Sequence, residues 1–137
     1  MKTVIDSYAW IEIFIGSKGG EKAKEILEKA EETCTPDVVM AEIARKYMRE
    51  GMKEHTILER LTTIEETSEI VSIDKNIALE SAKCYLELTE KAKKERLQAP
   101  SLFDAIVLAT ARKLGAKVVT GDEHFKHADE TLWVGKI

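Results

Sequence analysis

The acidic side chains of this 137-residue sequence predict one metal-binding pocket assembled from four separate segments. The candidates are Asp6, Glu42, Asp104 and Asp122. Carboxylates held close together raise one another's pKa, so such a cluster does not stay ionised without a compensating cation. Magnesium prefers oxygen ligands in octahedral geometry and is commonly held by carboxylates together with a substrate phosphate. The expected chemistry is phosphodiester hydrolysis, in which a metal lowers the pKa of a water and stabilises charge on the phosphate oxygens.

Each of these acids also has a purely structural interpretation. Asp6 and Asp122 could cap the helical turns that follow them, and Ser101 and Asp104 have the spacing of a capping box. Glu42 could form an ordinary ion pair along its helix. Helix caps have no need to lie together, however, whereas all four acids map to one edge of the predicted sheet. This shared position favours the metal site.

Short β-rich runs alternate with longer helical patterns along the chain. The predicted strands are 3–5, 33–35, 70–73, 117–120 and 132–134. The predicted helices are 8–15, 21–31, 36–50, 53–67, 75–97 and 101–114, with a short helical turn at 122–126. Strands separated by helices need crossover connections. We therefore expect a single α/β domain over 1–137, a three-layer α/β/α sandwich with a central, mainly parallel sheet of four to five strands.

Two local signals predict how helices begin. In Thr35-Pro36-Asp37, a hydroxyl side chain precedes a proline and an acid, so Thr35 is predicted to be an N-cap. The glycine-rich segment 16–20 follows a helix and lacks the spacing of a phosphate-binding P-loop, so we interpret it as a turn.

The predicted sheet places the four acids at the same edge, where its strands end. In an open parallel sheet, ligands bind at the carboxyl ends of the strands, near the switch in strand order. Asp6 ends the first strand, and Asp122 lies two residues past Thr120, the end of a later one. Glu42 lies a turn or two into its helix, and Asp104 lies in the first turn of another. The four carboxylates are therefore expected to converge.

Composition limits how the protein can bind nucleic acid. The formal net charge is −4, which argues against binding RNA through bulk positive charge. Local basic residues would be needed, and Arg45, Lys46 and Arg49 follow Glu42 along its helix. These three could contact RNA phosphates, or they could form a solvated helix face that complements the helix dipole.

The remaining candidates have simpler interpretations. Cys34 and Cys84 lie far apart on apolar segments and are predicted to be reduced core residues of an intracellular protein. His124 and His127 lack an HExxH frame and are expected at the surface rather than on zinc. No apolar run is long enough to cross a bilayer, so the predicted location is cytoplasmic, with no membrane partner.

Four segments together resemble the PIN-domain ribonucleases and, within them, the VapC-type toxins of toxin–antitoxin pairs. They are VIDS at 4–7, TPDVVMAEI at 35–43, SLFDAIVLATAR at 101–112 and VTGDEHF at 119–125. The resemblance implies a parallel sheet between helices and an endoribonuclease that uses Mg²⁺, with Mn²⁺ as a possible substitute. It implies Asp6 and Asp104 as direct metal ligands, with Glu42 and Asp122 completing the site and the Thr120 hydroxyl assisting.

The same resemblance implies a homodimer that is silenced by a small, VapB-like antitoxin. Two alternatives remain open: an RNA-processing PIN nuclease without an antitoxin, and a non-catalytic α/β module that binds RNA. A haloacid-dehalogenase-like phosphatase would need a second acid two residues after Asp6, where this chain has Tyr8.

Overall fold

The computed structural model describes residues 1–136, in which strands and helices alternate. The strands are β1 (Lys2–Ile5), β2 (Glu32–Pro36), β3 (Glu69–Val71), β4 (Lys117–Thr120) and β5 (Thr131–Trp133). The helices are α1 (Ser7–Ile15), α2 (Lys18–Lys29), α3 (Asp37–Arg49), α4 (Glu54–Thr67), α5 (Lys75–Glu95) and α6 (Leu102–Leu114), followed by the 3₁₀ turn η1 (Glu123–Phe125).

The five strands form one sheet in the order β3-β2-β1-β4-β5, and every neighbouring pair is parallel. The predicted parallel sheet is thereby confirmed. Val4 of β1 lies opposite Cys34 of β2 on one side and opposite Val118 of β4 on the other. The chain thus builds outward from β1 in one direction first and then in the other. The switch in strand order lies between β1 and β4, where a ligand crevice is expected in such folds.

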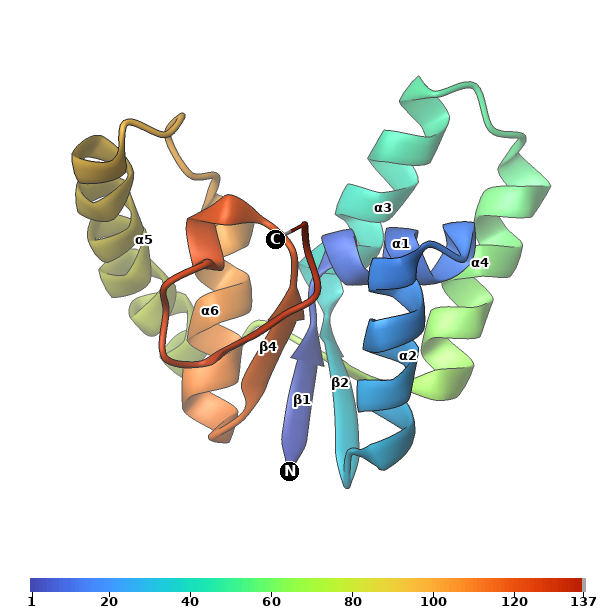
Figure 1. Ribbon diagram of the computed structural model, residues 1–137, viewed down its shortest axis with the longest axis horizontal. Helices are drawn as coiled ribbons and strands as arrows, with labels where there is room; N and C mark the ends of the chain where they lie inside the picture. The colour runs from blue at the N-terminus through green and yellow to red at the C-terminus, as the bar shows by residue number, and fades with distance from the viewer. Residues whose placement is uncertain (137) are drawn as a thin grey trace.

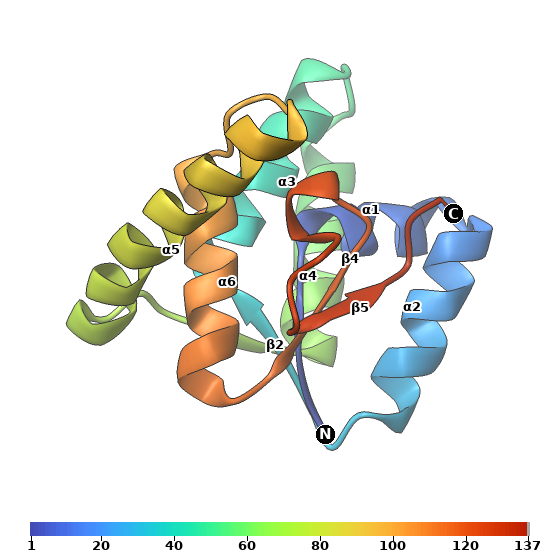
Figure 2. The same cartoon turned by 60° about the vertical axis from the view of Figure 1, so that its left-hand side comes forward.

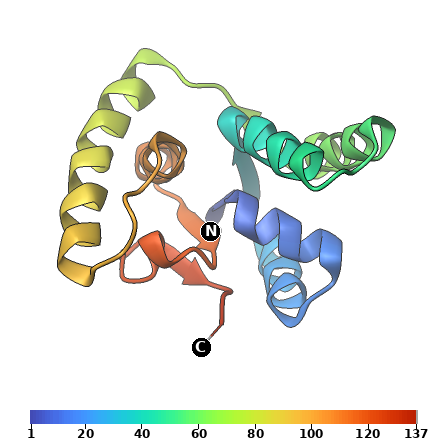
Figure 3. The ribbon, with the colours of Figure 1, turned by 90° about the horizontal axis from the view of Figure 1, so that it is seen from above.

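Helices cover both faces of the sheet, as predicted for a three-layer sandwich. Figures 1 and 3 show α1 to α4 on one side of the sheet and α5 and α6 on the other. Helix α6 packs against β1, β2 and β4, and α5 packs against α6. None of the helices in residues 1–136 is both long enough and apolar enough to span a membrane.

The central strands are buried because helices cover them from both sides. Val4 and Ile5 of β1 and Val118 and Val119 of β4 are fully buried, the pattern expected of a parallel sheet with two covered faces. Helix α6 is buried from Asp104 to Ala111 because it lies between the sheet and α5. The acids at the end of β1 and at the start of α6 therefore adjoin the buried core of the molecule.

The prediction of Thr35 as a helix N-cap is wrong. Strand β2 continues through Pro36, which pairs with Val71 of β3, and helix α3 begins at Asp37. The Thr35 hydroxyl instead accepts a hydrogen bond from the Trp10 indole nitrogen at 3.1 Å and lies 2.7 Å from the Ser68 hydroxyl. The Thr35 hydroxyl is therefore bound to residues that are distant in the sequence and does not cap α3.

The segment 16–20, interpreted as a turn, is helical in its second half. Helix α2 begins at Lys18, and the Ser17 hydroxyl accepts a hydrogen bond from the Gly20 amide at 3.0 Å as its N-cap. Only Gly16 is in the turn, where it ends α1 with a φ of +78°. At the other end of the chain, the segment after β5 returns beside the α1–α2 turn (Figure 2).

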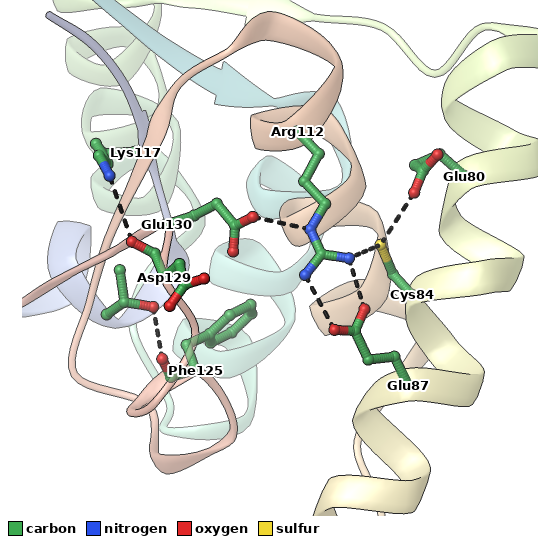
Figure 4. A network of polar contacts seen from close by, with 9 residues as sticks. Glu80, Cys84, Glu87, Arg112, Lys117, Phe125, Asp129 and Glu130 are labelled. Atoms are coloured by element: carbon green, nitrogen blue, oxygen red, sulfur yellow. Dashed lines mark hydrogen bonds and ion pairs between the residues drawn. The ribbon is translucent and has the colours of Figure 1, made fainter.

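Arg112 joins three segments on the outer side of α6 (Figure 4). Its Nε donates to Glu130 at 3.0 Å, and its terminal nitrogens donate to Glu87 of α5. One terminal nitrogen also lies 3.6 Å from the Cys84 sulfur. Burial raises the pKa of Cys84 to about 11, and both Cys34 and Cys84 are free and buried, as predicted. Arg112 therefore fastens α5 and the approach to β5 onto α6.

Replacing Arg112 with glutamine is expected to lower the free energy of unfolding by about 1–2 kcal/mol, because Glu130 loses a charged donor while partly buried. Urea denaturation measures this change. Lys117→Gln is the control, since the Lys117 side chain is exposed and donates to the Asp129 carbonyl at the surface, and its effect should stay within about 0.5 kcal/mol. Equal losses in both variants would contradict a role for Arg112 as a junction.

Candidate active site

Asp6 lies at the carboxyl end of β1 with 2 % of its surface exposed. One carboxylate oxygen accepts a hydrogen bond from the Ser7 amide at 2.8 Å, so Asp6 does cap α1. The other oxygen accepts from the Thr120 hydroxyl at 2.8 Å, across the β1–β4 switch point. One oxygen therefore caps α1, while the other is bound by Thr120, another residue of the predicted site.

Asp104 also caps a helix. It forms a capping box with Ser101: the Asp104 carboxylate accepts from the Ser101 amide at 3.0 Å, and the Ser101 hydroxyl accepts from the Asp104 amide at 3.1 Å. Only 8 % of the residue is exposed. The cap fixes the carboxylate at the first turn of α6, beside the carboxyl edge of the sheet.

Asp122 is positioned by its neighbours on the loop after β4. Its amide donates to the Thr120 hydroxyl at 3.0 Å, and its carboxylate accepts from the His124 amide at 2.9 Å. The Thr120 hydroxyl thus bridges the two strand ends, since it donates to Asp6 and accepts from Asp122. Glu42 completes the group from α3, where it is half-buried.

The charges of these four residues act on one another. Burial and the negative charges of Glu42, Asp122 and Asp104 together raise the pKa of Asp6 to about 8, although the hydrogen bond from Thr120 opposes the shift. Burial also raises the pKa of Glu42 and of Asp104, and each of these groups is repelled by Asp122. The structure therefore brings the four predicted acids within electrostatic reach of one another.

This donor set suits a hard divalent cation. Asp104, Asp122 and His124 can each offer one ligand atom, and these atoms lie within 4.8 Å of one another. Carboxylate oxygens match Mg²⁺ and Mn²⁺, and a hydrated Mg²⁺ retains several waters, so acids just outside this group can act through water. Asp6 and Glu42 are not in this group, but their charges interact with those of Asp104 and Asp122. The direct ligation by Asp6 and Asp104 that the resemblance implies remains a prediction.

A family model described as the PIN domain matches residues 3–131. The chain belongs to the PIN-domain family. The match runs from β1 to the first residue of β5 and includes the four acids, which confirms the resemblance found in the sequence. Membership in this family supports assigning the chain to the nucleases, which are hydrolases.

Solved structures with the same fold include toxins of the VapBC type. A VapBC complex from Rickettsia felis bound to promoter DNA is 16 % identical with a TM-score of 0.73, and the alignment covers 97 % of each chain. A toxin–antitoxin complex from Klebsiella pneumoniae is 21 % identical, with a TM-score of 0.67 over 98 % of this chain and 99 % of that one. A VapC toxin from Mycobacterium tuberculosis, described as cleaving the sarcin–ricin loop, is 16 % identical, with a TM-score of 0.68 over 93 % and 95 %. A sequence search of curated proteins finds no significant match.

The PIN domain of this chain includes a histidine that the sequence assigned to the surface. The His124 side chain is only 19 % exposed; its Nδ1 lies 2.9 Å from the Asp122 carboxylate and its Nε2 lies 2.8 Å from the Gln98 carbonyl. Burial alone lowers the pKa of His124, but these contacts and the charge of Asp104 give a net increase. The prediction was wrong because the loop from α5 to α6 folds over the imidazole. His127 is exposed, as expected.

Gly121 allows the PIN-domain site to close tightly. The Tyr8 ring packs against Gly121, which stands between Thr120 and Asp122, and a Cβ there would also lie 2.7 Å from the Gly135 Cα. No side chain fits in this space without a shift of the ring or of the backbone. The position of the Asp122 loop therefore depends on glycine, a requirement that nothing in the local sequence indicates.

The basic residues of α3 have separate environments. The Arg45 guanidinium lies 5.6 Å from the centre of the Phe103 ring, which belongs to α6, and Lys46 pairs with Glu50 at 3.1 Å. Arg49 is exposed. Contacts between these three side chains and RNA remain a prediction.

Proposed function

We propose that residues 1–137 act as a single PIN-domain nuclease, a metal-dependent endoribonuclease that hydrolyses RNA phosphodiester bonds as the toxin of a toxin–antitoxin pair. The observation that supports the proposal is the grouping of Asp6, Glu42, Asp104 and Asp122 near the β1–β4 switch point, where burial and repulsion by neighbouring carboxylates raise the pKa values of Asp6, Glu42 and Asp104. A cluster of this kind needs a cation to remain ionised, and RNA phosphates share that requirement.

The role we propose for each side chain follows from its position in the site. Asp6 and Asp104 would hold a divalent ion, with Glu42 and Asp122 binding directly or through water. When bound, such an ion supplies an activated water and neutralises charge on the phosphate. The Thr120 hydroxyl orients the Asp6 carboxylate, and the capping box with Ser101 orients that of Asp104. These contacts come from Thr120, the last residue of β4, and from Ser101, the N-cap of α6.

The toxin assignment draws support from the structural neighbours. Those from Klebsiella and Rickettsia were solved as toxin–antitoxin complexes, and the one from Mycobacterium is described as cleaving RNA. We therefore propose a small VapB-like antitoxin as the main protein partner and a homodimer as the assembly. The alternative is an RNA-processing PIN nuclease without an antitoxin. A non-catalytic module is disfavoured, because it would have no need to retain four mutually repelling carboxylates.

A direct test is cleavage of a mixed-sequence RNA by the purified protein with Mg²⁺, and again after EDTA treatment. Cleavage that requires Mg²⁺ or Mn²⁺ supports the proposal. RNA that stays intact with either metal present contradicts it. An adjacent open reading frame for a DNA-binding antitoxin would separate the toxin from the processing enzyme.

Metal binding can be tested apart from cleavage. We expect Mg²⁺ to raise the melting temperature of the wild type by several degrees, because the ion binds only the folded site, and to raise that of Asp104→Asn by much less. Differential scanning fluorimetry measures both shifts.

The matched control is Ser101→Ala, which removes the Ser101 hydroxyl but keeps the Ser101 backbone amide that donates to the Asp104 carboxylate. Its melting temperature should fall, since an N-cap is worth about 1 kcal/mol, while its Mg²⁺ shift should match that of the wild type. Equal Mg²⁺ shifts in the wild type and Asp104→Asn would show that Asp104 serves only as a cap.

A further inference from the structure

A groove of about 580 Å³ adjoins the acidic site between α1 and the α3–α4 pair. Figure 3 shows α1 beside these two helices. The groove shares Ser7 and Asp122 with the site region and is lined further along by the aromatic rings of Tyr8, Phe14 and Tyr47. A ligand that reaches the carboxylates can therefore continue directly into an aromatic-lined space.

Arg60 of α4 lies in this groove between two aromatic rings. Its guanidinium carbon is 5.1 Å from the centre of the Phe14 ring and 5.3 Å from that of Tyr47. Its Nη1 also donates to the Tyr47 hydroxyl at 3.3 Å. Two cation–π contacts and one hydrogen bond fix the plane of the guanidinium, which saves the entropy that a free arginine would lose on binding a ligand.

The charge of Arg60 is available to a ligand. Within residues 1–136, no carboxylate forms an ion pair with Arg60. The other cation of the groove, Lys46, is paired with Glu50 at 3.1 Å. Glu12, which also lines the groove, accepts a hydrogen bond from Ser17 at 3.2 Å. Arg60 is thus a half-buried, oriented cation whose charge is not neutralised by the protein.

We propose that Arg60, Phe14 and Tyr47 form a subsite for one nucleotide of single-stranded RNA next to the bond that is cleaved. This inference rests on the proposed nuclease function and names how its substrate is held. The guanidinium binds a flanking phosphate, and the base stacks on an aromatic ring of the groove. A chain with a net charge of −4 needs such local cations to bind RNA.

The test compares RNA cleavage by the wild type, Arg60→Gln and Arg60→Lys with Mg²⁺ present. We expect Arg60→Gln to raise KM about tenfold while kcat stays within about twofold, since one phosphate contact is lost away from the reacting atoms. Arg60→Lys should give an intermediate KM, because it keeps the charge but not the planar, stacking fork. Lys113→Gln is the control, an exposed cation in the last turn of α6 whose loss should leave KM unchanged.

Binding is measured separately, so that the subsite and the nuclease function can fail independently. Fluorescence anisotropy follows a labelled single-stranded RNA of about ten nucleotides bound to Asp6→Asn, with and without Arg60→Gln. Weaker binding and a shallower salt dependence with Arg60→Gln support the subsite, even if the wild type cleaves nothing, which would contradict only the proposed function.

Unchanged RNA affinity in Arg60→Gln, with a melting temperature showing that the variant is folded, overturns the subsite. The Arg60→Lys variant keeps the test usable if Arg60→Gln unfolds. If a labelled oligoglutamate peptide binds the wild type but not Arg60→Gln, and RNA binds both equally, the groove is a site for an acidic protein segment and the nucleotide subsite is wrong.

Discussion

Replacing Asp6 with asparagine is expected to lower metal-dependent RNA cleavage on the order of a thousandfold while leaving the fold intact. Asp6 is the most deeply buried of the four acids, and the other three all act on its charge. Asparagine has nearly the same shape. Its amide oxygen can still accept from the Ser7 amide, and its NH₂ group can donate to the Thr120 hydroxyl. The variant therefore lacks the charge that a divalent ion needs but keeps both anchoring contacts.

The matched control is Asp74→Asn. Asp74 also caps a helix, since its carboxylate accepts from the Ile77 amide at 2.8 Å at the start of α5, but it has no part in the acidic site. Its activity should equal that of the wild type. Full cleavage by a preparation of Asp6→Asn free of contaminating nuclease would refute the assignment of the active site.

Without metal, the protein should become less stable as the pH rises from about 4 to about 8. The pKa of Asp6 is about 8 in the folded state and near 4 in the unfolded chain. Below pH 4 the carboxyl is protonated in both states and costs nothing. Above pH 4 the unfolded chain releases its proton first, so unfolding becomes progressively easier until the folded carboxyl also ionises near pH 8. The raised pKa values of Glu42 and Asp104 act in the same direction.

Melting temperatures in EDTA at pH 5 and pH 8 measure this dependence. We expect the wild type to melt about 5 °C lower at pH 8, and Asp6→Asn to vary less and to be the more stable protein at pH 8. Mg²⁺ should restore the wild type at pH 8 but have little effect on the variant. If the metal-free wild type became more stable between pH 5 and pH 8, ionisation of these carboxyls would not destabilise the folded state, and the prediction would be wrong.

Much of the fold follows from patterns that depend on near neighbours. The apolar runs that became β1 and β4 each end at a polar residue of the site, and periodicity was enough to predict the helices between the strands. The carboxyl-edge rule for parallel sheets then placed Asp6 and Asp122 together. Ser101 and Asp104 form the capping box that their spacing predicts.

The errors arise where a distant segment changes the local preference. Thr35 would cap a helix if Trp10 and Ser68 did not bind its hydroxyl. The His124 side chain would be more exposed if the segment between α5 and α6 did not place the Gln98 carbonyl against it. Arg60 stands in an ordinary amphipathic pattern, and only the folded chain shows that Phe14 and Tyr47 enclose it. The residues next to Thr35, His124 and Arg60 in the sequence do not indicate which distant residues they contact.

The order of the strands has a consequence during synthesis on the ribosome. Asp6 is made 114 residues before the Thr120 hydroxyl that orients it, and Asp122 follows Thr120. A nascent chain in which this segment has not yet emerged lacks β4 and one of the four acids. We therefore expect such an incomplete chain to cleave no RNA, so that the activity we propose begins only after β4 has been made.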